Sequence, residues 1–94
     1  MESMQLDSEL ENTVTELRII AASLGELKPG TDKAKEIRGV QAMRFNDILD
    51  TMPHTLKRIA DNGQDPEIVN DKLKDSFDLI NEILKKMTVL KAAE

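Results

Sequence analysis

Proline and glycine interrupt this 94-residue chain at three places, and the stretches between them carry apolar residues at helical spacing. The interruptions are Lys28-Pro29-Gly30, Pro53, and the stretch from Asn62 to Pro66. Proline cannot donate a backbone hydrogen bond, and glycine accepts the left-handed conformation of a tight turn, so each place predicts a helix end. Apolar residues spaced by three and four positions predict amphipathic helices between these ends. The pattern therefore favours an all-α fold.

Four helices are expected within one domain of residues 1–94, over residues 8–28, 33–51, 53–61 and 66–91. Ser8 with Glu11 fits a capping box for the first helix, and Thr31 or Asp32 can cap the second. Residues 1–7 are expected to form a flexible acidic arm. The predicted architecture is an antiparallel helical hairpin, a short helix and a long C-terminal helix, in a coiled-coil-like bundle of three or four helices. The first helix carries a seam of Leu10, Val14, Leu17, Ala21 and Leu24.

The last predicted helix is longer than the helices expected before it. At about 1.5 Å per residue it would extend over about 39 Å, whereas each of the first two would cover about 30 Å. Its apolar seam continues to its end, so the far part has no expected partner within the chain. Exposed apolar patches mark association surfaces. We therefore expect three residues to face another protein or a second copy of the chain, namely Leu84, Met87 and Leu90.

Composition argues against several functional classes. The chain has no cysteine and a single histidine, which disfavours disulfide scaffolds, thiolate zinc sites and cysteine nucleophiles. The net charge of −5, with no tryptophan or tyrosine, is unlike a nucleic-acid binder. No apolar run approaches the roughly 20 residues that span a bilayer. We expect a non-enzymatic protein that binds other proteins, with no catalytic residue, cofactor, metal ion, small molecule, nucleic acid or membrane partner.

One tetrapeptide supports an alternative chemistry. His54-Thr55-Leu56-Lys57 resembles the H-x-L-K core of histidine phosphotransfer domains, which are helical bundles of similar size. In that family the histidine is exposed in the middle of a helix, with a lysine nearby to balance the phosphoryl charge. Here it follows Pro53 at a predicted helix start, and Arg58 stands where the family usually has glycine. An ordinary exposed histidine is the simpler interpretation.

A longer stretch, from Met52 to Val69, resembles the signature of Mediator subunit ten. Members of that family have an apolar residue and a proline, a short helical turn ending in an apolar-acidic pair, then glycine and proline before a long helix. Gln64-Asp65 stands where Arg-Asn is common, although Asp65 can still cap. The matching positions are Pro53, Leu56, Ile59, Asp61, Gly63, Asp65 and Pro66.

The resemblance implies a non-enzymatic nuclear subunit in the middle module of the Mediator coactivator of RNA polymerase II. Such a subunit would pair through its long helices with other subunits of the complex. A second hypothesis is a small acidic helical adaptor, secretion chaperone or phage-encoded inhibitor in the cytoplasm, whose acidic N-terminal residues bind a basic target. A phosphotransfer protein that uses His54 is the third hypothesis.

Overall fold

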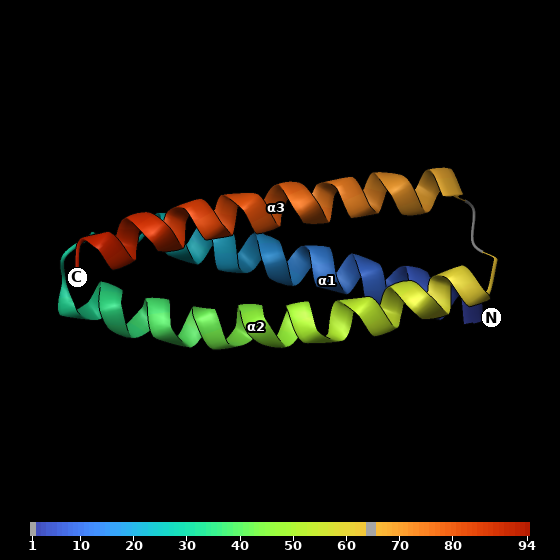
Figure 1. The fold of residues 1–94 in the computed structure, drawn as a ribbon, viewed down its shortest axis with the longest axis horizontal. Coiled ribbons are helices and arrows are strands. Elements are labelled where there is room, and N and C mark those ends of the chain that lie inside the picture. The colour runs from blue at the N-terminus through green and yellow to red at the C-terminus, as the bar shows by residue number, and fades with distance from the viewer. Residues whose placement is uncertain (1, 64–65) are drawn as a thin grey trace.

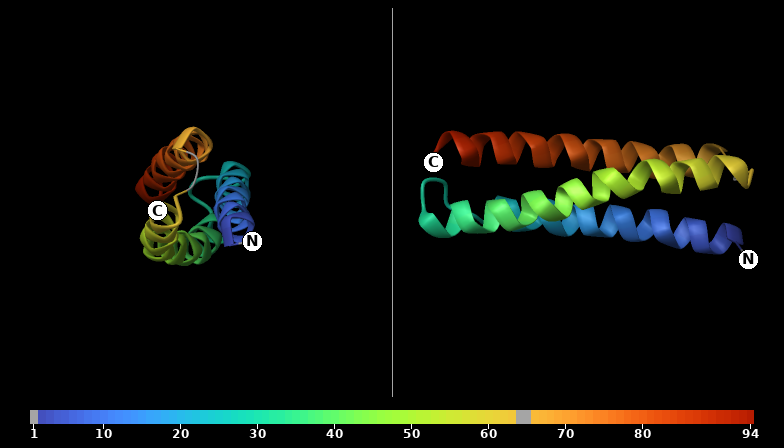
Figure 2. Two further views of the ribbon diagram at one scale, coloured as in Figure 1. Left: turned by 90° about the vertical axis from the view of Figure 1, so that its right-hand side faces the viewer. Right: turned by 60° about the horizontal axis from the view of Figure 1, so that its bottom comes forward.

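The computed structural model describes residues 2–63 and 66–94, with side chains from Glu9 onward apart from Pro66 and Ile68. These residues form three helices: α1 (Glu2–Gly25), α2 (Asp32–Asp61) and α3 (Pro66–Ala92). Consecutive helices run in opposite directions along a rod of 46 × 19 × 16 Å (Figure 1). Seen from its end, the rod has the helices at the corners of a triangle (Figure 2). The predicted all-α bundle is confirmed.

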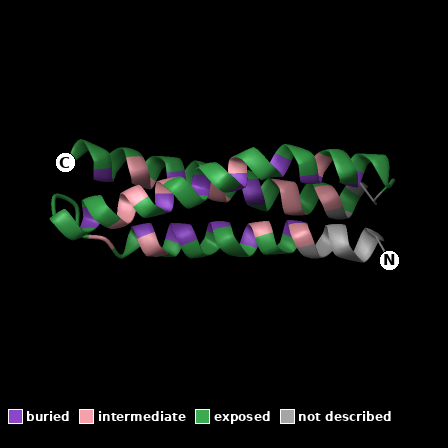
Figure 3. Ribbon diagram, turned by 90° about the horizontal axis from the view of Figure 1, so that it is seen from below, coloured by how far each residue is buried: buried purple, intermediate pink, exposed green. Residues whose placement is uncertain are grey.

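The core lies along the axis of the rod, where each helix presents one apolar face (Figure 3). The complete predicted seam of α1, from Leu10 to Leu24, is buried. It packs mainly against a large cluster that contains Phe45 and Ile48 of α2 with Ile83 and Leu90 of α3. A second cluster, nearer the α2–α3 turn, joins Leu10 with Ile59 and Val69. Burial of a leucine or isoleucine contributes about 1.5–3 kcal/mol, so these faces hold the bundle together.

Local chemistry defines the turn between α1 and α2. Gly30 adopts a φ of 85°, which is the left-handed conformation that glycine favours. Thr31 is the N-cap of α2, where its Oγ1 accepts a hydrogen bond from the backbone N–H of Ala34 at 3.1 Å. The predicted cap at Thr31 is therefore confirmed, while α1 ends at Gly25 rather than at Lys28.

The predicted break at Pro53 is wrong, because α2 continues through this proline as one helix of 30 residues. An interior proline costs a helix about 3 kcal/mol, since it removes a hydrogen bond and crowds the preceding turn. The core residues on either side follow one unbroken seam, in which Met52 precedes the proline and Thr55 and Ile59 follow it. Pro53 itself is exposed. Burial of this seam outweighs the local preference for a break.

Two other predicted boundaries are corrected. Helix α1 begins at Glu2, so residues 2–7 belong to the helix rather than to an arm before it, and Ser8 lies inside the helix instead of capping it. Helix α3 has 27 residues and α2 has 30, so the predicted excess length of the last helix is absent.

Candidate functional site

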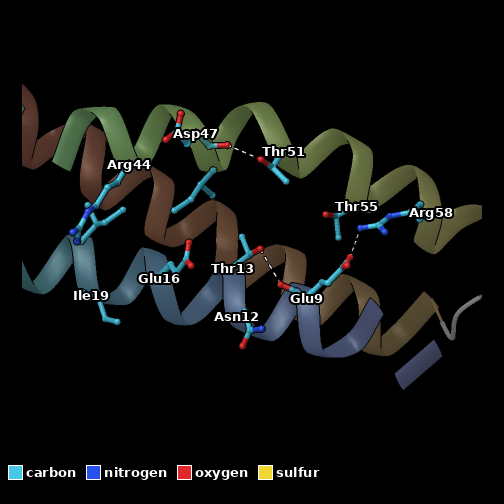
Figure 4. Close-up of a pocket in the computed structure, with 12 residues that line it drawn as sticks. Glu9, Asn12, Thr13, Glu16, Ile19, Arg44, Asp47, Thr51, Thr55 and Arg58 are labelled. Atoms are coloured by element: carbon cyan, nitrogen blue, oxygen red, sulfur yellow. Dashed lines mark hydrogen bonds and ion pairs between the residues drawn. The ribbon is translucent and has the colours of Figure 1, made fainter. Parts of the chain in front are cut away.

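A groove of about 550 Å³ runs between α1 and α2. Figure 4 shows Arg58 reaching from α2 to Glu9 of α1, with which it forms an ion pair at one end of the groove. Arg44 also extends from α2 toward α1 in this view. Apolar side chains form part of the wall, including Ile19, which is 56% exposed. The full lining is Glu9, Asn12, Thr13, Glu16, Ile19, Ile20, Arg44, Asp47, Ile48, Thr51, Thr55 and Arg58.

Polar side chains of this groove make contacts within or between the two helices. Thr13 donates its hydroxyl hydrogen to the Glu9 carbonyl oxygen at 3.0 Å, and Thr51 donates to the Asp47 carbonyl at 2.8 Å. The Glu9 carboxylate is held by Arg58. A nucleophilic mechanism needs a hydroxyl hydrogen-bonded to a base, and these two hydroxyls are bonded to backbone carbonyls instead. The lining, which mixes charged and apolar groups, suits contact with a polypeptide.

Among the residues that the structure describes, no group of three histidine or acidic side chains could hold a metal ion. None of the helices, over the same residues, is long and apolar enough to cross a bilayer.

His54 lies within the C-terminal third of α2 and is exposed, outside the residues that line the groove. Because α2 continues through Pro53, this histidine is not at the helix start that the sequence predicted. Lys57, three residues later, is also exposed. The pair therefore occupies one solvent-facing stretch of a helix.

Most positions of the Mediator-like signature come together in the last turns of α2 and the turn that follows. Ile59 is buried against Leu10 and Val69, and Leu56 is half-buried. Asp61 is the last residue of α2, and Gly63 adopts a φ of 64°. Pro66 is the first residue of α3, whereas Asp65 lies outside the described residues. These positions build the α2–α3 hairpin.

The residues predicted to face a partner separate into different environments. Leu90 is 5% exposed and belongs to the core, so the prediction that it faces a partner is wrong. Met87 is half-buried and packs against the same core, which also contradicts its assignment to a free end of the helix. Leu84 is 48% exposed. The physical reason is the antiparallel arrangement: the end of α3 lies beside the end of α1 and the start of α2 (Figure 1), and Leu90 shares one core cluster with Leu24 and Ala34.

Leu84 belongs to a longer row on α3, which we call the α3 stripe. The stripe consists of Leu73, Phe77, Ile80, Leu84 and Met87, which step by four, three, four and three residues. Phe77 is 54% exposed, and the other three members besides Leu84 are half-buried. The sequence pattern contains this row, but only the packing of the helices shows which of its members reach the surface.

The contacts between distant residues were not predicted. Glu9 and Arg58 lie 49 residues apart and meet across α1 and α2. Arg38 of α2 pairs with Glu94 beyond α3, at 2.7 Å between Nε and Oε2. Neither pair has the spacing of neighbours on one helix, which is the signal that sequence provides for ion pairs. Lys72, an apparent partner for nearby acids on α3, instead lies 3.9 Å from Glu11 of α1.

Comparison of the chain with known protein families, with curated proteins and with solved structures gives no match in any of the three.

Proposed function

We propose that this protein is a non-enzymatic helical subunit that binds other proteins in a multiprotein assembly. The α3 stripe carries the proposal, because Phe77 and Leu84 lie one heptad apart and are each about half exposed. Both residues lie on one face of α3, and exposed apolar patches mark association sites. The groove between α1 and α2, with Ile19 exposed at its wall, adds a second surface suited to a polypeptide.

We propose the Mediator middle module as the setting of this subunit. The support is the sequence signature together with its structural role. In the hairpin turn, Gly63 has a positive φ that disfavours any other residue, and Pro66 starts α3. Ile59 buries its side chain beneath the turn. Gly63, Pro66 and Ile59 therefore suit the backbone conformation or the burial that their positions in the α2–α3 hairpin require.

Affinity purification from the cell that naturally makes the protein tests both proposals: that the chain is a subunit of an assembly, and that this assembly is Mediator. The chain would carry a tag at its chromosomal locus, and an untagged strain would serve as the control. We expect recovery of a stable set of RNA polymerase II coactivator subunits, identified by mass spectrometry. Recovery of a secretion substrate or a lone basic protein would instead support the adaptor or chaperone hypothesis. Purification of the chain alone would contradict the proposal of a subunit.

A second candidate function is histidine phosphotransfer, and the exposure of His54 inside α2, rather than at a helix start, favours it. An imidazole nitrogen in this position can reach a phosphoryl donor, and the exposed Lys57 ammonium can offset the added negative charge. Incubation with acetyl phosphate or a phosphorylated receiver domain would place acid-labile phosphate on the wild-type chain and none on His54→Gln. The absence of transfer to the wild-type chain would remove this candidate.

A further inference from the structure

Asparagine and glycine stand next to each other where α2 ends. Asn62 is the C-cap of α2, and Gly63 follows it with a φ of 64°. Both residues are exposed to solvent. An asparagine before glycine has a side-chain amide that the next backbone nitrogen can attack, because glycine has no Cβ to hinder the approach. The end of α2 therefore places two groups that can react with each other in contact with water.

The reaction of these two groups is a ring closure followed by hydrolysis. The Gly63 backbone nitrogen gives up its proton to water and forms a bond to Asn62 Cγ. The bond from Cγ to Nδ2 breaks, and the leaving nitrogen takes up a proton and departs as ammonia. A water molecule then opens the cyclic imide at either carbonyl carbon. The product is aspartate in one case and isoaspartate, in which the backbone runs through the side chain, in the other.

Three features of the folded chain hold this reaction back. The Gly63 N–H donates a hydrogen bond to the Ala60 carbonyl oxygen at 3.3 Å, so the attacking nitrogen is engaged. Asn62 Nδ2 donates to the Arg58 carbonyl oxygen at 2.7 Å, which fixes the side-chain amide. The Asn62 ψ of 4° aligns the Gly63 nitrogen with the Asn62 backbone nitrogen. Ring closure instead requires the Gly63 nitrogen on the side of Cβ, so the backbone has to rotate first.

Opening of the last residues of α2 would release all three constraints together. Asn62, Gly63 and Arg58 are exposed, and a Cβ on Gly63 would meet no atom within 4 Å. No packed side chain therefore has to move when the backbone rotates there. Solvent-exposed hydrogen bonds exchange readily with water, and segments held by them open locally while the rest of the molecule stays folded. Ile59 is buried with Leu10 and Val69, which confines such an opening to the residues after it.

We propose that Asn62 is a site of spontaneous deamidation, and that opening of the end of α2 controls its rate. The other asparagines lie inside helices, where the next backbone nitrogen donates to the preceding turn and carries a residue with a side chain. Both conditions oppose ring closure, so the modification is specific to Asn62. The other asparagines are Asn12, Asn46, Asn70 and Asn81, and they are followed by threonine, aspartate, aspartate and glutamate.

The product weakens the end of α2. A carboxylate has no hydrogen to donate to the Arg58 carbonyl oxygen, so the hydrogen bond of the Asn62 amide is lost. The new negative charge also lies at the C-terminal end of a helix, which already carries a partial negative charge. Isoaspartate in addition lengthens the backbone path between α2 and Gly63. Each change loosens the α2–α3 hairpin, and the release of ammonia makes the change one-way.

Incubation of the purified full chain at physiological temperature and mildly alkaline pH, followed by peptide mass spectrometry, tests the proposal. We expect conversion of the amide to a carboxyl group at Asn62, with conversion at least about tenfold slower at each other asparagine. In water enriched in heavy oxygen the product should carry a heavy oxygen atom, and isoaspartate should accompany aspartate. Conversion at another asparagine equal to that at Asn62, or none at Asn62, would overturn the proposal.

The chemistry has a matched control. Asn62→Gln keeps a side-chain amide but lengthens the side chain by a methylene group, which disfavours closure of the ring. We expect no conversion at this position over the time in which the wild-type chain reacts. Conversion of the variant at the wild-type rate, or a wild-type product that contains aspartate alone, would show direct hydrolysis and contradict ring closure.

Control by the fold is measured by comparing the native chain with the chain in urea. The open form reacts in proportion to its population when opening is fast relative to the chemistry, so unfolding should raise the Asn62 rate by about tenfold or more. Equal rates would contradict control by the fold. Ile83→Val removes a methyl group from a core residue that is 0% exposed and lowers global stability. It should leave the native rate within about twofold, because the opening is local. A rate increase that matches its loss of stability would show that the whole bundle has to unfold.

The effect of the product can be measured separately. Asn62→Asp has the composition of one product and should unfold at lower urea concentration than the wild-type chain. The control is Asn70→Asp, which adds the same charge at an exposed position of α3 and should shift the midpoint less. An Asn62→Asp chain as stable as the wild type would contradict the weakening proposed for the product.

Discussion

Arg38 and Glu94 join the start of α2 to the residues beyond α3. Arg38 Nε lies 2.7 Å from Glu94 Oε2, and Nη2 donates a hydrogen bond to Oε1 at 3.0 Å. This hydrogen bond is the main reason that the pKa of the Glu94 side chain lies below its usual value of 4.5, and positive charges on Arg38, Lys35 and Lys91 add to the effect. The pair closes the end of the rod opposite the α2–α3 hairpin.

The effect of Arg38→Met should depend on pH. Since folding lowers the pKa of Glu94, the pair stabilises the fold fully above the unfolded value of 4.5 and loses this contribution as pH falls through the lower folded value. We expect the variant to unfold at lower urea concentration than the wild type at about pH 6, and the difference to shrink by about pH 2. NMR titration of the Glu94 carboxyl carbon should show its pKa returning toward 4.5 in the variant. An identical Glu94 pKa in both proteins would contradict the role of this pair.

Gly63→Ala and Gly39→Ala should change stability in opposite directions. Gly63 has a φ of 64°, a left-handed conformation that would cost alanine about 1 kcal/mol of backbone energy. A Cβ there would meet no atom within 4 Å, so no steric clash would add to this cost. Gly39 lies inside α2 with equally open space, where alanine should stabilise the helix by about 0.5–1 kcal/mol. Urea unfolding of both variants would measure this. A Gly63→Ala variant as stable as the wild type would show that the α2–α3 turn does not need glycine at its left-handed position.

Gln41→Met should stabilise the bundle. Gln41 is 8% exposed, and its Nε2 donates to Ser23 Oγ at 3.1 Å while its Oε1 is buried without a hydrogen-bond partner. Replacing the amide with an apolar side chain of similar length removes the unpaired oxygen, for an expected gain of about 1 kcal/mol. Ser23→Ala is the matched control, because it leaves the buried amide with fewer partners and should destabilise. Thermal unfolding would distinguish them, and a marked loss of stability in Gln41→Met would refute the interpretation.

Pro53→Ala should also stabilise the isolated chain. Alanine restores the backbone donor inside α2 and removes the clash with the preceding turn, which together are worth about 3 kcal/mol. The loss of proline makes the unfolded chain more flexible, which offsets about 0.4–1 kcal/mol. We therefore expect a net gain of about 2 kcal/mol in urea unfolding. A less stable variant would show that Pro53 makes a favourable contribution that the helix geometry does not reveal.

Leu17→Asp should unfold the domain, whereas Ile19→Asp should not. Leu17 is 0% exposed at the centre of the α1 seam, and an unpaired charge buried there costs several kcal/mol, comparable with the total stability of a chain of this size. Ile19, two residues away, is 56% exposed, so its aspartate would remain hydrated and cost about 1 kcal/mol or less. Far-UV circular dichroism would separate the two. A helical, cooperatively unfolding Leu17→Asp chain would contradict the assigned core.

The seam of α1 could be predicted residue by residue, because its spacing alone determines which side chains share a face. The cap at Thr31 and the turn at Gly30 could likewise be predicted, because each depends on a few neighbouring backbone groups. The groove between α1 and α2 could not be predicted, because side chains from two separate helices line it, and Glu9 and Arg58 meet at one end. The α3 stripe was not predicted as a unit, because its division into buried and exposed members depends on where α1 and α2 lie.

By itself the sequence determined that the chain is helical, that turns lie at Gly30 and Gly63 and which face of α1 is buried, because these follow from interactions among residues a few positions apart. The tertiary structure decided that α2 passes through Pro53, that Leu90 is covered and that Phe77 and Leu84 are left half exposed. Each of these outcomes depends on burial between helices, which can outweigh a local cost of about 3 kcal/mol. The residue pattern within one helix does not show whether burial between helices will outweigh the local cost.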